Sequence, residues 1–123
     1  MPSSPSSTVV HHRWTDIAPE AITPAISRRF ISGERVTVAR FELKRGGVVP
    51  RHEHENEQVT FVISGALKFD LDGRDVVVRG GEVLQIPGGV PHQVEVVEDA
   101  LVLDVFCPVR QDWIDKTDTY FGR

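Results

Sequence analysis

Two histidines one residue apart, His52 and His54, are the residues of this sequence best suited to chemistry. Side chains alternate between two faces on an extended segment, so both imidazoles are expected on one face. Gln58 has the same parity, and His92 lies on a later apolar run from which it can approach across a sheet. Because imidazoles suit borderline divalent ions, we predict one metal ion (Zn, Ni, Fe or Mn) held by His52, His54, Gln58 and His92.

The remaining acidic and histidine residues receive weaker assignments. His11 and His12 stand beside a Ser/Pro-rich stretch and are expected to be solvated. Glu57 has the opposite parity to Gln58, so it would become a ligand only if the strand slipped by one residue. Gln58 itself offers a neutral oxygen, which leaves more of the ion's charge to polarise a substrate. The alternative is a decayed site in which Gln58 only forms hydrogen bonds.

Asp104 is a carboxylate inside the apolar run 100–106, where alternation places it on one face with Val102 and Phe106. A charge buried without a partner costs several kcal/mol or more. Two interpretations are open. Asp104 either forms a structural pair with Arg40 or Arg110, or it faces the metal and moves a proton, with its pKa raised by desolvation.

Short β-like runs must position these residues, and each run is ended by turn residues. Asp72-Gly73 between two alternating runs predicts a tight hairpin. Short strands at even spacing predict an all-β sandwich or barrel. Pro19 and Pro24 make 14–24 irregular, and 110–123 is expected to be a short helix or arm against the barrel or a second subunit. The predicted strands are 25–32, 35–43, 58–64, 66–71, 75–79, 82–86, 92–97 and 100–106.

The composition limits the class of protein. The chain has 123 residues and a net charge of −4, which fits one domain and not a nucleic-acid binder. No apolar run is long enough to span a membrane. The single cysteine, Cys107, fits a reducing cytoplasm, where we expect the protein. Residues 1–13 are predicted to be a disordered leader and residues 14–123 a single domain with its core at about 35–106.

Two spaced motifs resemble those of the cupin family. Residues 46–65 (GGVVPRHEHENEQVTFVISG) resemble the first motif, G-x5-H-x-H-x3-E-x6-G, and residues 81–92 (GEVLQIPGGVPH) resemble the second, G-x5-P-x-G-x2-H. Gln58 stands where the family usually has a glutamate ligand, and Val96 where it often has an asparagine. The resemblance covers about 35–106 and implies a jelly-roll-like cupin β-barrel with one bound metal ion.

A closer resemblance extends over residues 91–113. Their pattern L-D-V-F-x-P-x-R-x-D is similar to that of KdgF-type cupins of pectin and alginate breakdown. It implies ring opening and ketonisation of 4,5-unsaturated uronates, with Asp104 as acid/base and Phe106 shaping the pocket. Arg110 would grip the substrate carboxylate, because its planar fork matches a carboxylate. The implied partners are a carboxylated sugar and, as in most small cupins, a second copy of the chain.

Two other functions stay open. A set of three histidines also suits a metal-dependent dioxygenase acting on a small diketone or phenolic, which would consume oxygen. The other alternative is a non-catalytic sugar-binding cupin, which would bind a uronate without converting it.

Overall fold

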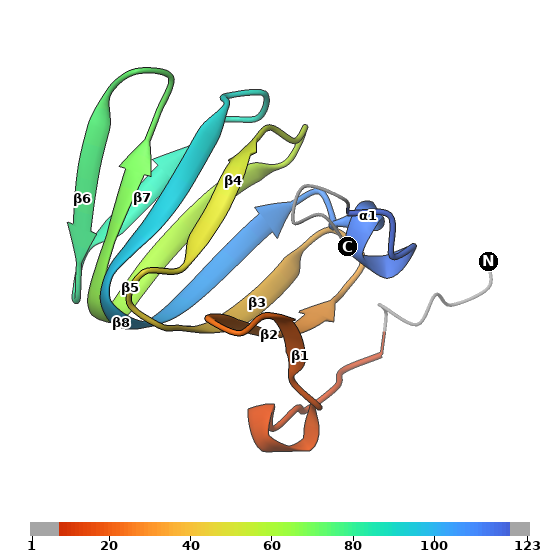
Figure 1. Cartoon of the computed structure of the whole chain (residues 1–123). Helices are drawn as coiled ribbons and strands as arrows, with labels where there is room; N and C mark the ends of the chain where they lie inside the picture. The colour runs from red at the N-terminus through yellow and green to blue at the C-terminus, as the bar shows by residue number, and fades with distance from the viewer. Residues whose placement is uncertain (1–7, 119–123) are drawn as a thin grey trace.

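Antiparallel strands make up almost all of the regular secondary structure in the protein, a computed structural model that describes residues 8–118 (Figure 1). The all-β prediction is therefore confirmed. The elements in chain order are η2 (Trp14–Asp16), β1 (Glu20–Thr23), β2 (Ile26–Ser32), β3 (Thr37–Leu43), β4 (Val48–His52), β5 (Glu57–Asp70), β6 (Asp75–Arg79), β7 (Val83–Ile86), β8 (His92–Cys107) and α1 (Gln111–Ile114).

Two long strands, β5 and β8, run through both halves of the barrel. The first half of β8 pairs with β4 and with the second half of β5, which in turn pairs with β6. The second half of β8 pairs with β3 and with the first half of β5, which pairs with β7. In Figure 1, β8 turns from cyan to blue as it passes from one half to the other. The two halves face each other and enclose the core.

The continuity of β5 and β8 corrects the prediction of two strands in each region. Gly65 lies within β5 at a φ of +84°, and the pairing with β8 is irregular around it. A Cβ added at Gly65 would stand 2.0 Å from the carbonyl oxygen of Asp99 in β8. The residues between the predicted strands of each pair, Gly65 among them, therefore mark bends within β5 and β8 at which these two strands lie close together.

Replacing Gly65 with alanine is expected to lower the free energy of unfolding by about 3 kcal/mol or more, because the positive φ and the clash with Asp99 act together. Gly73→Ala is the matched control. Gly73 has a φ of +91°, but an added Cβ would meet nothing within 4 Å. It should cost about 1 kcal/mol. Denaturant unfolding of both variants makes the comparison, and equal losses would contradict the close approach.

Two strands, β1 and β4, were not predicted. β1 lies between Pro19 and Pro24, in a stretch that was expected to be irregular, and β4 contains Pro50. Each pairs with one neighbour only, β1 with β2 and β4 with β8. An edge strand tolerates proline because one side of its backbone needs no partner.

The C-terminal segment packs on the barrel of its own chain. Helix α1 carries Trp113, which is buried and makes edge contacts with Phe30, Phe41 and Phe106. The expectation of a short C-terminal helix against the barrel thus fits residues 111–114. The end of the predicted C-terminal arm, residues 119–123, and most of the predicted N-terminal leader lie outside the described residues.

Candidate metal centre

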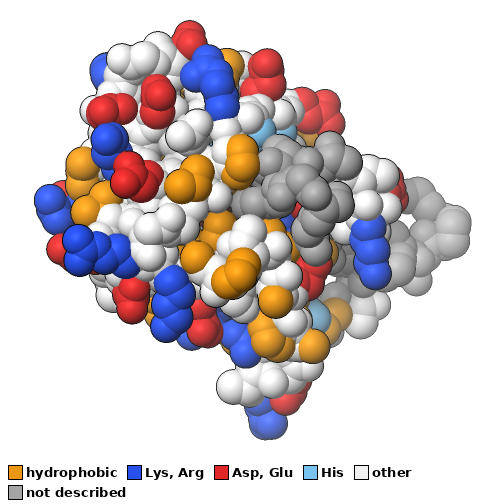
Figure 2. Space-filling view, in the orientation of Figure 1, with side chains coloured by type: hydrophobic (Ala, Val, Ile, Leu, Met, Phe, Trp, Pro, Cys, Tyr) orange, Lys and Arg blue, Asp and Glu red, His pale blue; other side chains and the backbone are white. Residues whose placement is uncertain are grey.

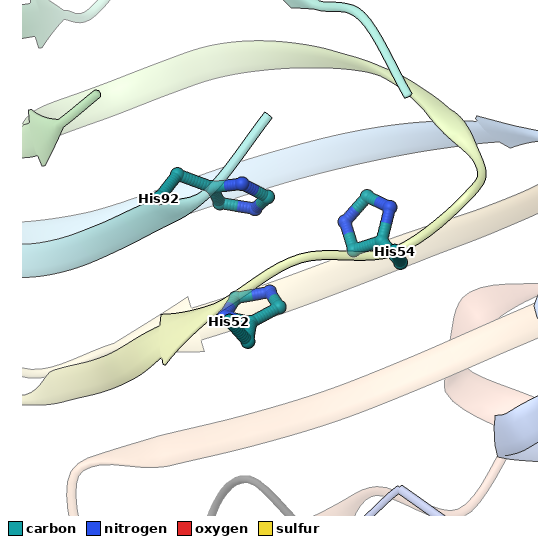
Figure 3. A group of neighbouring side chains, drawn as sticks. All are labelled: His52, His54 and His92. Atoms are coloured by element: carbon teal, nitrogen blue, oxygen red, sulfur yellow. The ribbon is translucent and has the colours of Figure 1, made fainter. Parts of the chain in front are cut away.

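Three histidines converge at one end of the barrel (Figure 3). His52 ends β4 and His92 begins β8, and the two are paired in the strand register. His54 follows in the turn after β4. One ring nitrogen from each of the three lies within 4.8 Å of the other two. The strand ends thus bring together residues 40 positions apart in sequence.

The backbone fixes which ring nitrogen each histidine offers. Every Nδ1 lies 2.8 to 3.0 Å from a backbone carbonyl oxygen two residues away. A carbonyl only accepts hydrogen bonds, so Nδ1 carries the proton and Nε2 keeps its lone pair. The Nε2 atom of His92 is buried with no hydrogen-bond partner among the described residues. The carbonyls are those of Pro50, Asn56 and Val90.

Burial also keeps the three rings neutral. Burial is the main cause that lowers the pKa of His52 and of His54 to about 4; the charge of Arg110 acts in the same direction, and the backbone hydrogen bonds of the two rings oppose it. The pKa of His92 is lowered for the same main reason. Neutral imidazoles with fixed tautomers and inward lone pairs are what a divalent ion requires. The three histidines could therefore hold a metal ion.

Gln58 could add an oxygen to the three histidines. Its amide nitrogen donates to Thr60 Oγ1 at 2.9 Å, and its Oε1 lies 3.0 Å from His54 Nε2. The Thr60 hydroxyl donates its single proton to the ionised Asp104 carboxylate, so its oxygen can only accept a hydrogen bond from Gln58. The amide nitrogen of Gln58 must therefore face Thr60, and the amide oxygen must face His54. Two lone pairs, on Gln58 Oε1 and His54 Nε2, then face each other. A cation between them would satisfy both, so the donor set fits a metal ion.

Gln58 reaches the site for a different reason from the one predicted. β4 ends at His52, the chain turns, and β5 begins at Glu57, so no single extended segment joins the ligands. The alternation of β5 turns Gln58 and Thr60 inward and Glu57 outward. The Glu57 carboxylate accepts a hydrogen bond from Gln85 at 3.1 Å, away from the histidines. His11 and His12 are exposed and outside the cluster.

Asp104 projects into the same cavity as His52 and His92. It shares the inward face of β8 with Phe106, as predicted. Burial raises its pKa from 3.8 to about 6, against hydrogen bonds from Thr60 and Gln58 and the charge of Arg110. Oδ1 has no hydrogen-bond partner among the described residues. A carboxyl group with a pKa near neutrality can both take and return a proton.

The structural Asp–Arg pair considered for Asp104 is not what the structure contains. Arg40 lies on the outer face and bonds Glu42 at 2.7 Å. Arg110 forms a bidentate pair with Asp112, Nε to Oδ1 at 2.9 Å and Nη2 to Oδ2 at 2.8 Å. Within the described part of the chain, no Lys or Arg nitrogen comes within ion-pair distance of Asp104.

Arg110 is buried and forms part of the cavity wall. Its guanidinium carbon lies 4.7 Å from the ring centroid of Phe106 and 4.3 Å from that of Trp113. Burial favours the neutral form of Asp112, but the hydrogen bond and charge of Arg110 outweigh it and lower the pKa of Asp112. Stacking and the ion pair thus fix the plane of the guanidinium.

The cavity between these residues has a volume of about 50 Å³ and an apolar floor. This space holds only a few water molecules. A ligand would place only its reacting group there. The floor consists of Phe41, Leu43, Val49, Leu67, Phe69, Val94 and Val102.

Three neighbours of the site were missed from the sequence. Thr60 follows Gln58 by two residues, and the period-two rule that selected Gln58 could have found it. Asp112 belongs to the R-x-D pattern, but nothing in that pattern indicated a pair with Arg110. Asn56, in the turn between the ligands, carries no signal of its own in the sequence.

The metal-free protein should lose stability as the pH falls. His52 and His54 have a folded-state pKa of about 4 and an ordinary value of 6.5, so the unfolded chain binds more protons between these pH values. Their contribution is full above pH 6.5 and is lost towards pH 4. Asp104, with a raised pKa, opposes this in part. The net loss from pH 7 to pH 5 should be about 2 kcal/mol.

Denaturant unfolding of chelated protein at both pH values measures this loss. A variant with His52 and His54 replaced by asparagine should show a much smaller loss. An equal pH dependence in the variant would contradict the assignment to these two rings.

Comparison with known proteins agrees with this geometry. Residues 39–106 match the Cupin domain family. An uncharacterised protein of Streptomyces coelicolor is 30% identical over 81 residues, which cover 65% of this chain and 77% of that protein. Auxin-binding protein ABP19b of Prunus persica is 30% identical over 86 residues, or 63% of this chain. The match spans only 41% of the length of that plant protein.

Among solved structures, KdgF from Halomonas sp. superposes with a TM-score of 0.80 at 26% identity. The match covers 86% of this chain and 99% of that one. The similarity therefore includes nearly all of KdgF.

Proposed function

Because the chain belongs to the cupin domain family, we propose that it is a metal-dependent enzyme that opens and ketonises 4,5-unsaturated uronate sugars. The observation that carries the proposal is the placement of Asp104 in the same cavity as His52 and His92, two of the three clustered histidines. The likeness to KdgF over nearly the whole of that chain supports it.

The proposed metal ligands are His52, His54, Gln58 and His92. A divalent ion bound there would supply positive charge next to a substrate oxygen on which negative charge develops. The donor set of three imidazoles and one amide is neutral, so Zn, Ni, Fe and Mn all remain candidates.

The side chains on the opposite wall provide binding and proton transfer. Arg110 would pair with the sugar carboxylate, which it is suited to bind through two parallel hydrogen bonds. Phe106 stacks against Arg110 and limits the space beside it. The narrow cavity admits only the reacting edge of the sugar, and the rest would lie in its mouth.

The proposed reaction is an isomerisation with no net change in atoms or electrons. The bond between the anomeric carbon and the ring oxygen breaks, the proton of the anomeric hydroxyl passes to the former ring oxygen, and an aldehyde and an enol form. The enol then gains a proton on carbon, loses the proton of its hydroxyl, and becomes a ketone. Asp104, whose pKa is about 6, is the group we assign to this proton transfer.

Incubation with 4,5-unsaturated galacturonate, and separately with its alginate-derived counterpart, tests the proposal. The metal-loaded protein should accelerate loss of the conjugated-acid absorbance, and NMR should identify the linear ketone. Chelation should abolish the effect, and restoring each metal in turn should identify the active one. No acceleration with metal confirmed as bound would refute the proposal.

The same samples distinguish the two alternatives. Oxygen consumption with a diketone or phenolic would favour a metal-dependent dioxygenase. The three neutral histidines would also suit the metal ion of such an enzyme. Tight uronate binding by calorimetry without turnover would favour a non-catalytic sugar-binding protein.

The remaining expectations concern partners and location. Positive and negative side chains are interspersed over the face seen in Figure 2, which supports a small-molecule partner over nucleic acid. Three large apolar side chains, Phe61, Ile63 and Val83, are exposed on strands β5 and β7. A second copy of the chain would cover them, which supports a homodimer, and light scattering tests this.

No helix among residues 8–118 is long and apolar enough to cross a membrane. A cytoplasmic location is proposed from the single cysteine.

A further inference from the structure

Asn56 links the turn that carries His54 to the segment that carries Arg110. It is buried, with 4% of its surface exposed, although it lies in the turn between β4 and β5. Its backbone carbonyl is the acceptor 3.0 Å from His54 Nδ1. That contact leaves the Nε2 lone pair of His54 for the centre of the histidine cluster.

The side chain of Asn56 points the other way, to the segment after β8. Its amide nitrogen donates to the carbonyl oxygens of Pro108 at 2.6 Å and Val109 at 3.1 Å. Arg110 is the next residue, and its backbone nitrogen donates to Thr37 Oγ1 at 2.9 Å. The backbone on the N-terminal side of Arg110 is therefore held by Asn56, and Arg110 itself by β3.

An asparagine amide suits this position. Two backbone carbonyls must be satisfied, and both of the amide's protons are used. Aspartate has the same shape, but its ionised form has no proton to donate and would face two acceptors. The contact joins residues 52 and 53 positions apart in sequence, so it fixes tertiary structure and not a local turn.

The other side of the turn is held by different groups. Gly89 donates its backbone N–H to the carbonyl oxygen of His54 at 2.8 Å. A Cβ added at Gly88 would stand 2.2 Å from the carbonyl oxygen of Glu55. The loop before β8 thus supports the turn from one side, and Asn56 ties it to the Arg110 segment on the other.

We propose that Asn56 is a positioning residue that keeps Arg110 in register with the metal-binding turn. This rests on the proposed function only in that Arg110 is taken to bind the substrate carboxylate. Asn56 touches neither the cavity nor a reacting atom. Its effect on catalysis is exerted through Arg110.

The test compares Asn56→Asp with the parent protein, both in a Trp14→Phe background. Trp113 is then the only tryptophan, and the Arg110 guanidinium stacks on it at 4.3 Å. Asn56→Asp should shift the Trp113 emission, keep the metal content near that of the parent, and raise KM about 10- to 100-fold with a smaller change in kcat. Glu55→Gln, an exposed neighbour in the same turn, should change none of these.

A double-mutant cycle shows whether the effect passes through Arg110. In an Arg110→Lys background, Asn56→Asp should have little further effect on kcat/KM. Full additivity, or an unchanged KM and emission in folded Asn56→Asp, would overturn the proposal. A purely structural role would lower Tm without changing KM.

A measurement on the unsubstituted protein covers the case in which Asn56→Asp does not fold. Both side-chain amide protons of Asn56 should exchange slowly with solvent by NMR, and rapid exchange of either would overturn the proposal. The exchange rates and the Trp113 emission need no substrate. If the protein converts no uronate, the proposed function fails, while these two readouts still decide whether Asn56 holds the Arg110 segment.

Discussion

Asp104→Asn is expected to remove catalysis while leaving metal binding intact and making the protein more stable. As the proposed proton carrier, Asp104 should contribute about 10²- to 10⁴-fold to kcat. Asparagine keeps the shape of the side chain but cannot carry the proton. Metal content should not change, because Asp104 is not among the proposed ligands.

The gain in stability follows from the raised pKa of Asp104. A folded-state pKa of about 6 against an ordinary value of 3.8 means that ionised Asp104 destabilises the fold above pH 6. A neutral amide removes this cost, which is up to about 3 kcal/mol at pH 7. The excess stability should shrink as the pH falls through 6, because Asp104 then becomes protonated in the parent.

Asp99→Asn is the matched control, because it makes the same chemical change on the same strand at an exposed position. It should leave kcat, metal content and unfolding midpoint near those of the parent. Turnover of unsaturated galacturonate, elemental analysis and denaturant unfolding at pH 7 and pH 5 supply the readouts. An active Asp104→Asn with normal metal content would assign the proton transfer to another group.

The inward face of each strand could be predicted from the sequence because burial alternates with period two. This rule placed Asp104 with Phe106 correctly, and the structure shows the same alternation along β8. It also selected Gln58, but by counting from His54 through a turn that breaks the count. Gln58 still faces inward, because the alternation of β5 itself places it there.

The long-range features could not be predicted, because the same residue types make turns and bends. Gly65 and Asp99 have turn chemistry, yet they lie face to face within continuous strands, and only the tertiary contact distinguishes the two cases. The pair between Arg110 and Asp112 depends on how α1 follows β8. The contact of Asn56 with Pro108 joins segments whose proximity no local pattern encodes.

His92→Ala is expected to reduce metal affinity by more than about 100-fold, since loss of a ligand should exceed the 10- to 100-fold effect of losing an outer hydrogen-bond partner. His92 is paired in register with His52, and its Nε2 is buried with no partner among the described residues. Calorimetry on chelated protein measures the affinity, and uronate turnover should fall with it.

His12→Ala is the control, because His12 is exposed and outside the cluster. It should bind one metal ion as the parent does. Equal metal binding by His92→Ala and the parent would place the ion elsewhere and remove the basis for the centre.

Substitutions of Gln58 test the fourth ligand separately from the histidines. Gln58→Ala should weaken binding by less than His92→Ala, because a neutral amide oxygen is the weakest donor of the set, and unchanged affinity would remove Gln58 from it. Gln58→Glu adds a negative charge next to the ion and should bind it more tightly. The same charge neutralises part of the field that would act on a substrate oxygen, so kcat should fall as affinity rises. Opposite changes in affinity and turnover would indicate that the neutral amide serves the reaction at a cost in metal binding.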